Sequence, residues 1–318
     1  MSAVTDILGT RYPFIQAPMN WMTNPVFVAA VANAGGLGVV GTNAGQTTVT
    51  TDPVGTAERT RAAIRGTREL TDKPIGLNLL VAPGNEFSER TLEVALEEGI
   101  EAYVTIGEPD ADTFRRIQDS GAVIIHRPLN PTLEELRRAE DFGADLIVAT
   151  GYDEGGITPT VSTGTFSIVP TFVDAARVPV IAAGAINDAR GVAAAQALGA
   201  QGVFVGTRLM VTRESPLADS AKQAIINATG WDVDWVAPSR RSVLTPYARG
   251  LAEQYHSDGD AEAASARLVD SGAVRVGMVD GDLEAGIISV NTAISLIHDE
   301  PSVAELIERM MTGWREHA

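Results

Sequence analysis

The chain has 318 residues, 45% of them hydrophobic, which suits one large domain or one domain with an appendage. Its formal charge of −17 excludes nucleic acid and anionic membranes as favoured partners, because such a surface repels phosphate groups. Cysteine is absent, which excludes disulfides and a thiolate nucleophile and is typical of a cytoplasmic protein. We expect neither a membrane span nor a secretory signal, because no long apolar run and no basic leader occurs.

Short apolar runs alternate with helical segments over the first two-thirds of the chain. Strands that alternate with helices in this way predict parallel βαβ construction. Eight such units over roughly 225 residues fit a TIM (β/α)8 barrel better than an open doubly wound sheet. An open sheet would need a GxGxxG motif after its first strand, and FIQAPMNWM offers none. The predicted strands are 13–18, 36–40, 74–80, 102–106, 122–127, 145–150, 178–184 and 202–206.

Helix-start residues support this α/β reading. NDARGVAAAQALGA, between the last two strands, predicts a helix capped by Asn187 or Asp188. Pro109 and Asp110 begin another helix after the fourth strand. We therefore expect a (β/α)8 barrel domain over residues 1–227 and a helical appendage packed on it over residues 228–318.

The appendage itself breaks the strand–helix alternation. Residues 228–244 are expected to be irregular. Helical stretches are expected near residues 245–256, 260–272, 291–300 and 302–316.

The loops after the strands form the working face of a barrel. Gly184 follows the seventh strand, and Gly206 and Thr207 follow the eighth, where this fold commonly binds phosphate. The simpler alternative is that both glycines make tight turns. Their joint occurrence favours a phosphate site.

Two further polar positions lie on the same face. Gly155 and Gly156 follow the sixth strand and would let a flat ligand or phosphate approach the main chain, while Asp153 and Glu154 could accept hydrogen bonds from that ligand. An ordinary acidic loop tip is the alternative. Asn78 stands in an apolar strand, where its amide needs a partner, either a structural hydrogen bond or a ligand.

Candidate catalytic groups are few. His126, near the end of the fifth strand, is a candidate general base or, with Arg127, a cationic group facing an anionic ligand; a satisfied core histidine is the alternative. A Schiff-base lysine is excluded, because Lys73 precedes the third strand and Lys222 follows the last one within a helix. No HxH, HExxH or other histidine cluster indicates a catalytic metal.

Several motifs together resemble the nitronate monooxygenase (2-nitropropane dioxygenase) family, whose close relatives are the FMN-dependent enoyl-acyl carrier protein reductases. The resemblance extends from residue 13 to about residue 305, and no single motif would suffice. The motifs are QAPMNWMTNPVFVAAVANAGGLGVVG, GLNLL, GADLIVATGYDEGG, VPVIAAGAINDARGVAAAQALGAQGVFVGTR and VDGDLEAGIISVNTAISLIHDEPS.

The resemblance implies a TIM-barrel flavoprotein that binds FMN. The main chain of the QAPM segment would touch the isoalloxazine ring, the strand-three Asn would lie near its pyrimidine side, and the glycines after strands seven and eight would hold the phosphate. Carried onto this chain, the expected cofactor-binding residues are Ala17, Pro18, Met19, Asn78, His126, Asp153, Gly155, Gly156, Gly184, Gly206 and Thr207.

One departure from the family pattern concerns the reaction. The family usually reads E-A-G-G-H after strand six, whereas this chain reads DEGGI, with Ile157 at the position of the catalytic histidine. We therefore expect an FMN-dependent oxidoreductase with an atypical reaction on a small molecule, either nitronate monooxygenase-like or a reductase using NADH or NADPH. His126, Tyr152 or a water molecule would then supply any proton.

Two alternatives stay open at this point. One is a non-catalytic, degenerate flavin-binding relative, which the loss of the histidine favours. The other is a flavin-free phosphate-ester lyase or isomerase on the same barrel, against which the missing lysine counts. The sequence leaves the oligomeric state open, with a homodimer as one option.

Overall fold

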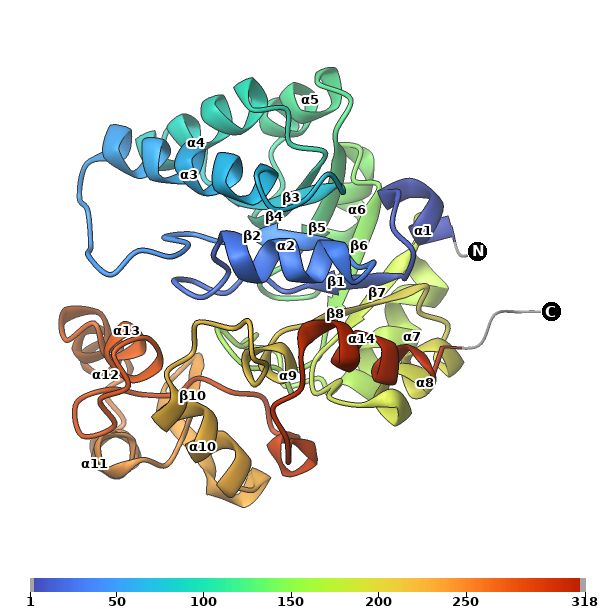
Figure 1. The fold of residues 1–318 in the computed structure, drawn as a ribbon. Coiled ribbons are helices and arrows are strands. Elements are labelled where there is room, and N and C mark those ends of the chain that lie inside the picture. Colours follow the sequence, from blue (N-terminus) through green and yellow to red (C-terminus); the bar gives the residue numbers. More distant parts are fainter. Residues whose placement is uncertain (1–2, 315–318) are drawn as a thin grey trace.

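The computed structural model describes residues 3–314, except for the side chain of Asp258, and its main feature is the predicted TIM barrel (Figure 1). All eight predicted strands form. They are buried on both faces, which is why their sequences are apolar throughout instead of alternating. The strands are β1 Phe14–Gln16, β2 Gly38–Val40, β3 Ile75–Val81, β4 Ala102–Gly107, β5 Val123–Arg127, β6 Leu146–Thr150, β7 Val180–Ala183 and β8 Gly202–Val205.

The strands are all parallel and are hydrogen-bonded in the order β1-β8-β7-β6-β5-β4-β3-β2. A single parallel bridge between Ile15 and Leu37 connects β1 to the segment that leads into β2, and this bridge closes the ring. In a closed parallel barrel all the carboxyl ends of the strands lie at one rim. The loops singled out in the sequence therefore share one face of the molecule.

Side chains alternate between the barrel interior and the layer under the helices. The interior cluster includes Val104, Val148 and Phe204, each at most 6% exposed. Burying a side chain of this size stabilises the fold by roughly 1.5–3 kcal/mol. Helix α1 (Ala3–Leu8) adds Val4 and Leu8 to the same cluster and so packs against the barrel interior.

The helices between the strands begin at capping residues that the sequence supplies. Asp188 caps α8 by accepting hydrogen bonds from the N–H groups of Arg190 and Gly191, and Asp110 caps α5 in the same manner. Both predicted helix starts are confirmed. The barrel helices are α2 Pro25–Asn33, α3 Pro53–Arg68, α4 Glu86–Glu97, α5 Ala111–Asp119, α6 Leu133–Asp141, α7 Thr165–Ala175, α8 Ala189–Ala197, the short α9 Thr207–Met210 and α10 Asp219–Asn227.

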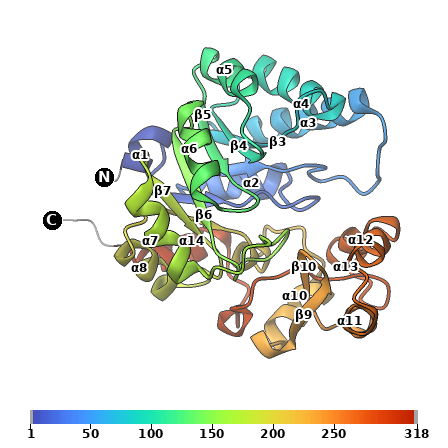
Figure 2. The same cartoon turned by 180° about the vertical axis from the view of Figure 1, so that it is seen from behind.

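The segment after the barrel differs from the expectation of an irregular stretch. After the 3-10 turn η1 (Gly230–Asp232), β9 (Val233–Ala237) and β10 (Arg240–Val243) form an antiparallel hairpin. The hairpin precedes α11 (Pro246–Asp258), α12 (Ala261–Asp270) and α13 (Ala273–Met278). Apolar side chains of the hairpin and these helices form a core of their own, and Figures 1 and 2 show this accessory unit, in orange and red, on one side of the barrel.

The last part of the chain returns to the barrel. The helix expected over residues 291–300 is reduced to a 3-10 turn, η2 (Ile294–Leu296), whereas the last predicted helix forms as α14 (Val303–Met311). Ser302 caps α14 in a capping box with Glu305. Helix α14 lies against α2 and α8 of the barrel (Figure 1). Its side chains Leu306 and Met310 are buried. No helix within residues 3–314 combines the length and apolar character needed to cross a bilayer.

Candidate active site

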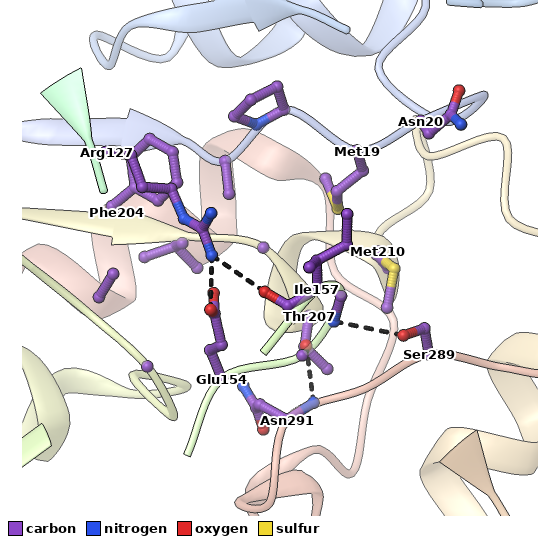
Figure 3. A pocket seen from close by; sticks show the side chains of 18 of the residues that line it. Met19, Asn20, Arg127, Glu154, Ile157, Phe204, Thr207, Met210, Ser289 and Asn291 are labelled. Atoms are coloured by element: carbon purple, nitrogen blue, oxygen red, sulfur yellow. Dashed lines mark hydrogen bonds and ion pairs between the residues drawn. The ribbon is translucent and has the colours of Figure 1, made fainter. Parts of the chain in front are cut away.

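A cavity of about 400 Å³ opens at the carboxyl ends of the strands, within the usual size range for ligand sites. Loops after β1, β6, β7 and β8 supply part of its wall. Residues at or just after the ends of β2 to β5 add to the barrel side, and the accessory unit and the segment before η2 contribute residues such as Arg240, Met278 and Asn291. The cavity therefore lies where the barrel meets the C-terminal part of the chain (Figure 3).

The loops after β7 and β8 bring the main chain close to the cavity. Gly184 has φ +109°, and a Cβ there would lie 2.6 Å from the hydroxyl oxygen of Thr165. Ala185 follows with φ +56°, a left-handed conformation that costs a non-glycine residue roughly 1 kcal/mol. Gly206 and Thr207 line the cavity from the end of β8. Gly184, Gly206 and Thr207 were predicted to bind the cofactor. All three lie on the cavity wall together with Ala185.

This part of the wall presents hydrogen-bond donors without acceptors. Within residues 3–314, the backbone N–H groups of Ala185, Gly206 and Thr207 donate to no other residue. The hydroxyl oxygen of Thr207 accepts a hydrogen bond from the N–H of Asn291 at 3.0 Å, so its own proton is free to donate. Converging donors of this kind suit a bound anion such as a phosphate group.

Two buried asparagines connect the loop after β7 to the segment before η2, next to these donors. The side chains of Asn187 and Asn291 exchange two hydrogen bonds, of 3.0 and 2.8 Å, and both residues are buried. The amide of Asn187 also donates to the carbonyl of Ala293 at 2.9 Å. Because buried amides are costly when unpaired, this network holds the loop after β7 against the segment before η2.

The loop after β6 forms the opposite wall. Gly155 approaches the C-terminal segment so closely that a Cβ would lie 2.6 Å from the carbonyl carbon of Val290. The N–H of Gly156 donates to the hydroxyl of Ser289 at 3.2 Å, and Gly156 has φ +83°. Ile157 lines the cavity with 51% of its surface exposed (Figure 3). The two glycines therefore let this loop and the C-terminal segment meet at the cavity.

Asp153, expected to bind the cofactor, has a different partner. Its carboxylate accepts hydrogen bonds from the N–H of Thr165 at 2.6 Å and from its hydroxyl at 2.9 Å, at the first residue of α7. It does not line the cavity. The structure gives Asp153 the role of holding the loop after β6 against α7.

The remaining expected ligand residues lie on the β1 and β3 side. Ala17, Pro18 and Met19 line the cavity with the main chain that follows β1. Asn78 lines it from β3, and its amide nitrogen donates to the carbonyl of Val104 at 3.1 Å. Its side-chain oxygen accepts no hydrogen bond from the described residues, so Asn78 has both a structural bond and an acceptor available to a ligand.

His126 lies outside the cavity. It is fully buried, its Nδ1 lies 3.0 Å from the hydroxyl of Thr105, and its ring packs against Phe114 of α5. Burial and the neighbouring Arg127 lower the pKa of His126 to about 3. The structure therefore places His126 in the layer between the sheet and the helices, apart from the other expected site residues.

Arg127, by contrast, faces the cavity and forms an ion pair there. Its Nη2 lies 2.5 Å from Oε1 of Glu154 and 3.3 Å from the carbonyl of Ile157, as Figure 3 shows. The side chains are only 9% and 12% exposed. Burial raises the pKa of Glu154, while the charges of Arg127, Arg241 and Arg240 oppose that rise.

The accessory unit contributes site residues that the sequence did not indicate. Arg240, Val274 and Met278 line the cavity from the hairpin and from α13, and Ser289 and Asn291 line it from the following segment. The last two lie in a motif that carried the family resemblance, which was the only signal available. No group of three or more acidic or histidine side chains within residues 3–314 is arranged to hold a metal ion.

A (β/α)8 barrel with a small-molecule cavity at the carboxyl ends of its strands belongs to the class of barrel enzymes. Within that class the chain belongs to the nitronate monooxygenase family, whose sequence profile matches residues 1–313. The chain is an oxidoreductase of this family. Members of the family act on small molecules and usually carry FMN.

The relatives are named for different activities. The chain is 29% identical to (3aS,4S,5R,7aS)-5-hydroxy-7a-methyl-1-oxo-octahydro-1H-indene-4-carboxyl-CoA dehydrogenase of Mycobacterium tuberculosis, over 97% of this chain and 94% of that protein. It is 31% identical to a probable nitronate monooxygenase of Staphylococcus saprophyticus, over 70% of this chain and 71% of that protein. The structure of FabK from Thermotoga maritima superimposes with a TM-score of 0.86 at 31% identity, over 99% of this chain and 96% of that one.

Proposed function

We propose that the chain is an FMN-dependent oxidoreductase that holds the cofactor phosphate between the loops after β7 and β8. The observation that carries this proposal is the set of donors at Ala185, Gly206 and Thr207, which have no acceptor within residues 3–314. Unpaired donors grouped on one cavity wall suit a phosphate group. The family's usual cofactor supports the same assignment.

The other cavity residues suit the flavin ring. Ala17, Pro18 and Met19 line one side of the cavity, and Asn78 keeps an acceptor for a ring N–H. Gly155 and Gly156 remove side chains from the facing wall, so that a planar ring fits between the loops. When bound, FMN supplies the redox chemistry of the reaction.

The substrate part of the cavity is mainly apolar. Leu80, Ile106, Leu129 and Ile157 line it from the barrel, and Val274 and Met278 line it from the accessory unit. Such a wall binds an organic substrate through its apolar body. Ile157 offers no group for proton transfer, so we propose that the reaction differs from that of relatives with histidine at this position.

A coenzyme A thioester is a second candidate for the substrate. Two dehydrogenases named for a carboxyl-CoA compound match 97% and 96% of this chain, whereas the named staphylococcal nitronate monooxygenases match 70–72%. The longer match includes the accessory unit that lines the apolar part of the cavity. This makes a thioester substrate as well supported as a nitronate.

Anaerobic mixing of the FMN-loaded protein with a reduced nicotinamide, an alkyl nitronate or an acyl-CoA tests the proposal. Bleaching of the flavin by NADH or NADPH indicates a reductase, bleaching by an alkyl nitronate alone indicates a nitronate monooxygenase, and bleaching by an acyl-CoA indicates a dehydrogenase. A protein that retains FMN but is bleached by none of them contradicts the enzymatic proposal and favours a non-catalytic flavin-binding protein. The Ile157→His variant tests whether residue 157 determines the reaction. Unchanged nitronate turnover in this variant would argue against such control.

A further inference from the structure

The side chains that line the cavity include few that can exchange a proton. Apart from Arg127 and Arg240, the titratable lining residue is Glu154, and no histidine, lysine, tyrosine, cysteine or aspartate within residues 3–314 lines this cavity. Arginine keeps its proton at all relevant pH values. Any proton that a side chain of this wall takes or gives must therefore pass through Glu154.

The geometry of Glu154 leaves one carboxylate oxygen available. Arg127 binds Oε1, and the same guanidinium also donates to the carbonyl of Ile157, which fixes the side chain beside that residue (Figure 3). Oε2 of Glu154 accepts no hydrogen bond from the described residues. A carboxylate that is held through one oxygen and free at the other is suited to exchange a proton with a ligand in the cavity.

Three positively charged groups act on Glu154, and they have different roles. Arg127 is its direct partner. Arg241 is occupied elsewhere: it donates to the backbone carbonyls of Glu154 and Tyr152, and it lies 4.3 Å from the ring centre of Trp235. The guanidinium of Arg240 makes no hydrogen bond or ion pair with a described residue, so its N–H groups are available to a ligand.

The burial of Glu154 and the charges around it set its pKa in a way that suits proton transfer. Burial raises the pKa of Glu154 above its ordinary value, and Arg127, Arg241 and Arg240 counteract this. The carboxylate is thereby more basic than an exposed glutamate. A base whose pKa lies closer to the working pH is the more effective one.

We infer that Glu154 is the catalytic acid–base residue of this cavity and that it acts on a carbon acid, a substrate with a C–H bond next to a nitro or carbonyl group. The C–H bond breaks, its proton forms an O–H bond with the carboxylate, and its electron pair moves onto the nitro or carbonyl oxygen. Arg240 donates hydrogen bonds to that oxygen and stabilises its charge. The inference rests on the proposed use of this cavity as the active site.

Exchange of substrate hydrogen for deuterium measures this step without net turnover. The FMN-loaded protein is incubated anaerobically with nitroethane in D₂O, and loss of the α-proton signal is followed by NMR. We expect Glu154→Gln to slow the catalysed exchange at least about 100-fold, in line with the usual contribution of a general base. Arg240→Gln should slow it by at least about 10-fold through the lost stabilisation of the oxygen.

Two further variants separate catalysis from folding. Glu253→Gln removes an exposed carboxylate from α11, and we expect it to exchange at the wild-type rate. Ile157→His added to Glu154→Gln places a base on the same cavity wall, and we expect it to restore part of the exchange. The melting temperature and FMN content of each variant show whether it is folded and loaded.

The pH dependence gives a second signature. The wild-type exchange rate should rise with pH up to the raised pKa of Glu154 and then level off, whereas Glu154→Gln should lose this step. Equal exchange by FMN-loaded wild-type protein and Glu154→Gln would overturn the inference while leaving the proposed function standing. A protein that fails to bind FMN would instead contradict the proposed function.

Discussion

Replacing Arg127 by methionine should destabilise the protein through Glu154. The substitution leaves a carboxylate that is only 12% exposed without its direct partner. Removing one member of a fully buried ion pair costs about 3–5 kcal/mol. Because the carboxylate lines a cavity and keeps the charges of Arg240 and Arg241, we expect about 2 kcal/mol here, or roughly 4 °C in melting temperature.

A double-mutant cycle isolates the pair. Glu154→Gln alone replaces a charged hydrogen bond by a neutral one and should cost about 1 kcal/mol. When Arg127→Met is combined with Glu154→Gln, no carboxylate is left unpaired, so the total loss should be smaller than the sum of the single losses by about 1–2 kcal/mol. Thermal unfolding of the wild-type protein and the three variants gives this coupling.

The sign of the pH dependence follows from the raised pKa of Glu154. A carboxyl whose pKa is higher in the folded than in the unfolded state binds more protons when folded, so stability falls as pH rises from the ordinary value of 4.5 through the folded pKa. Removing Arg127 raises that pKa further, so the deficit of Arg127→Met should shrink as pH falls towards 4.5. Two results together would show that Arg127 does not stabilise the protein through Glu154. The stability losses of the two single variants would be additive, and the loss caused by Arg127→Met would be the same at every pH.

Three further predictions concern the remaining cavity and the buried histidine. Gly155→Ala should cost about 1–3 kcal/mol in unfolding experiments and reduce FMN retention, because its Cβ would lie 2.6 Å from the main chain of Val290. Thr207→Ala should weaken FMN binding about 10-fold in a fluorescence titration, whereas Thr207→Ser should bind normally; equal binding by both would exclude the hydroxyl as a ligand. His126→Gln should leave the pH–rate profile between about pH 5 and 8 unchanged, because the pKa of the native histidine is about 3; a lost inflection would assign it a catalytic role.

The barrel could be predicted from the sequence because its strands are short, fully apolar and separated by capped helices. A run of this kind predicts a buried strand from its own residues, without knowledge of the rest of the chain. The hairpin β9–β10 was missed for the opposite reason. Its strands mix Trp, Asp and Arg with apolar residues, and a two-stranded hairpin is stabilised by what it packs against, which local pattern does not reveal.

The cavity residues after β7 and β8 could be predicted from the sequence, and those contributed by the C-terminal part could be predicted only in part. Gly184, Gly206 and Thr207 follow strands directly, so their common location follows from the barrel itself. Arg240 and Ser289 reach the cavity only because the C-terminal part docks on the loop after β6, for example through the bond from Gly156 to Ser289 across 133 residues. Contacts at such separation depend on tertiary packing and leave no periodic signal.

His126 shows the limit of assigning sites by strand position. It stands one residue before Arg127, near the carboxyl end of β5, yet successive side chains of a strand point to opposite faces. Arg127 therefore faces the cavity while His126 packs against α5. A one-residue difference in register separates a cavity residue from a core residue.

We propose that the loops after β7 and β8 hold the phosphate of FMN. The most direct test is to compare the binding of FMN and of riboflavin, which lacks the phosphate, to the apoprotein by flavin fluorescence. We expect one FMN per chain and an affinity at least about 100-fold higher than for riboflavin, since several N–H donors and a hydroxyl would contact the phosphate. Equal affinity for the two flavins, or no binding of either, would contradict it.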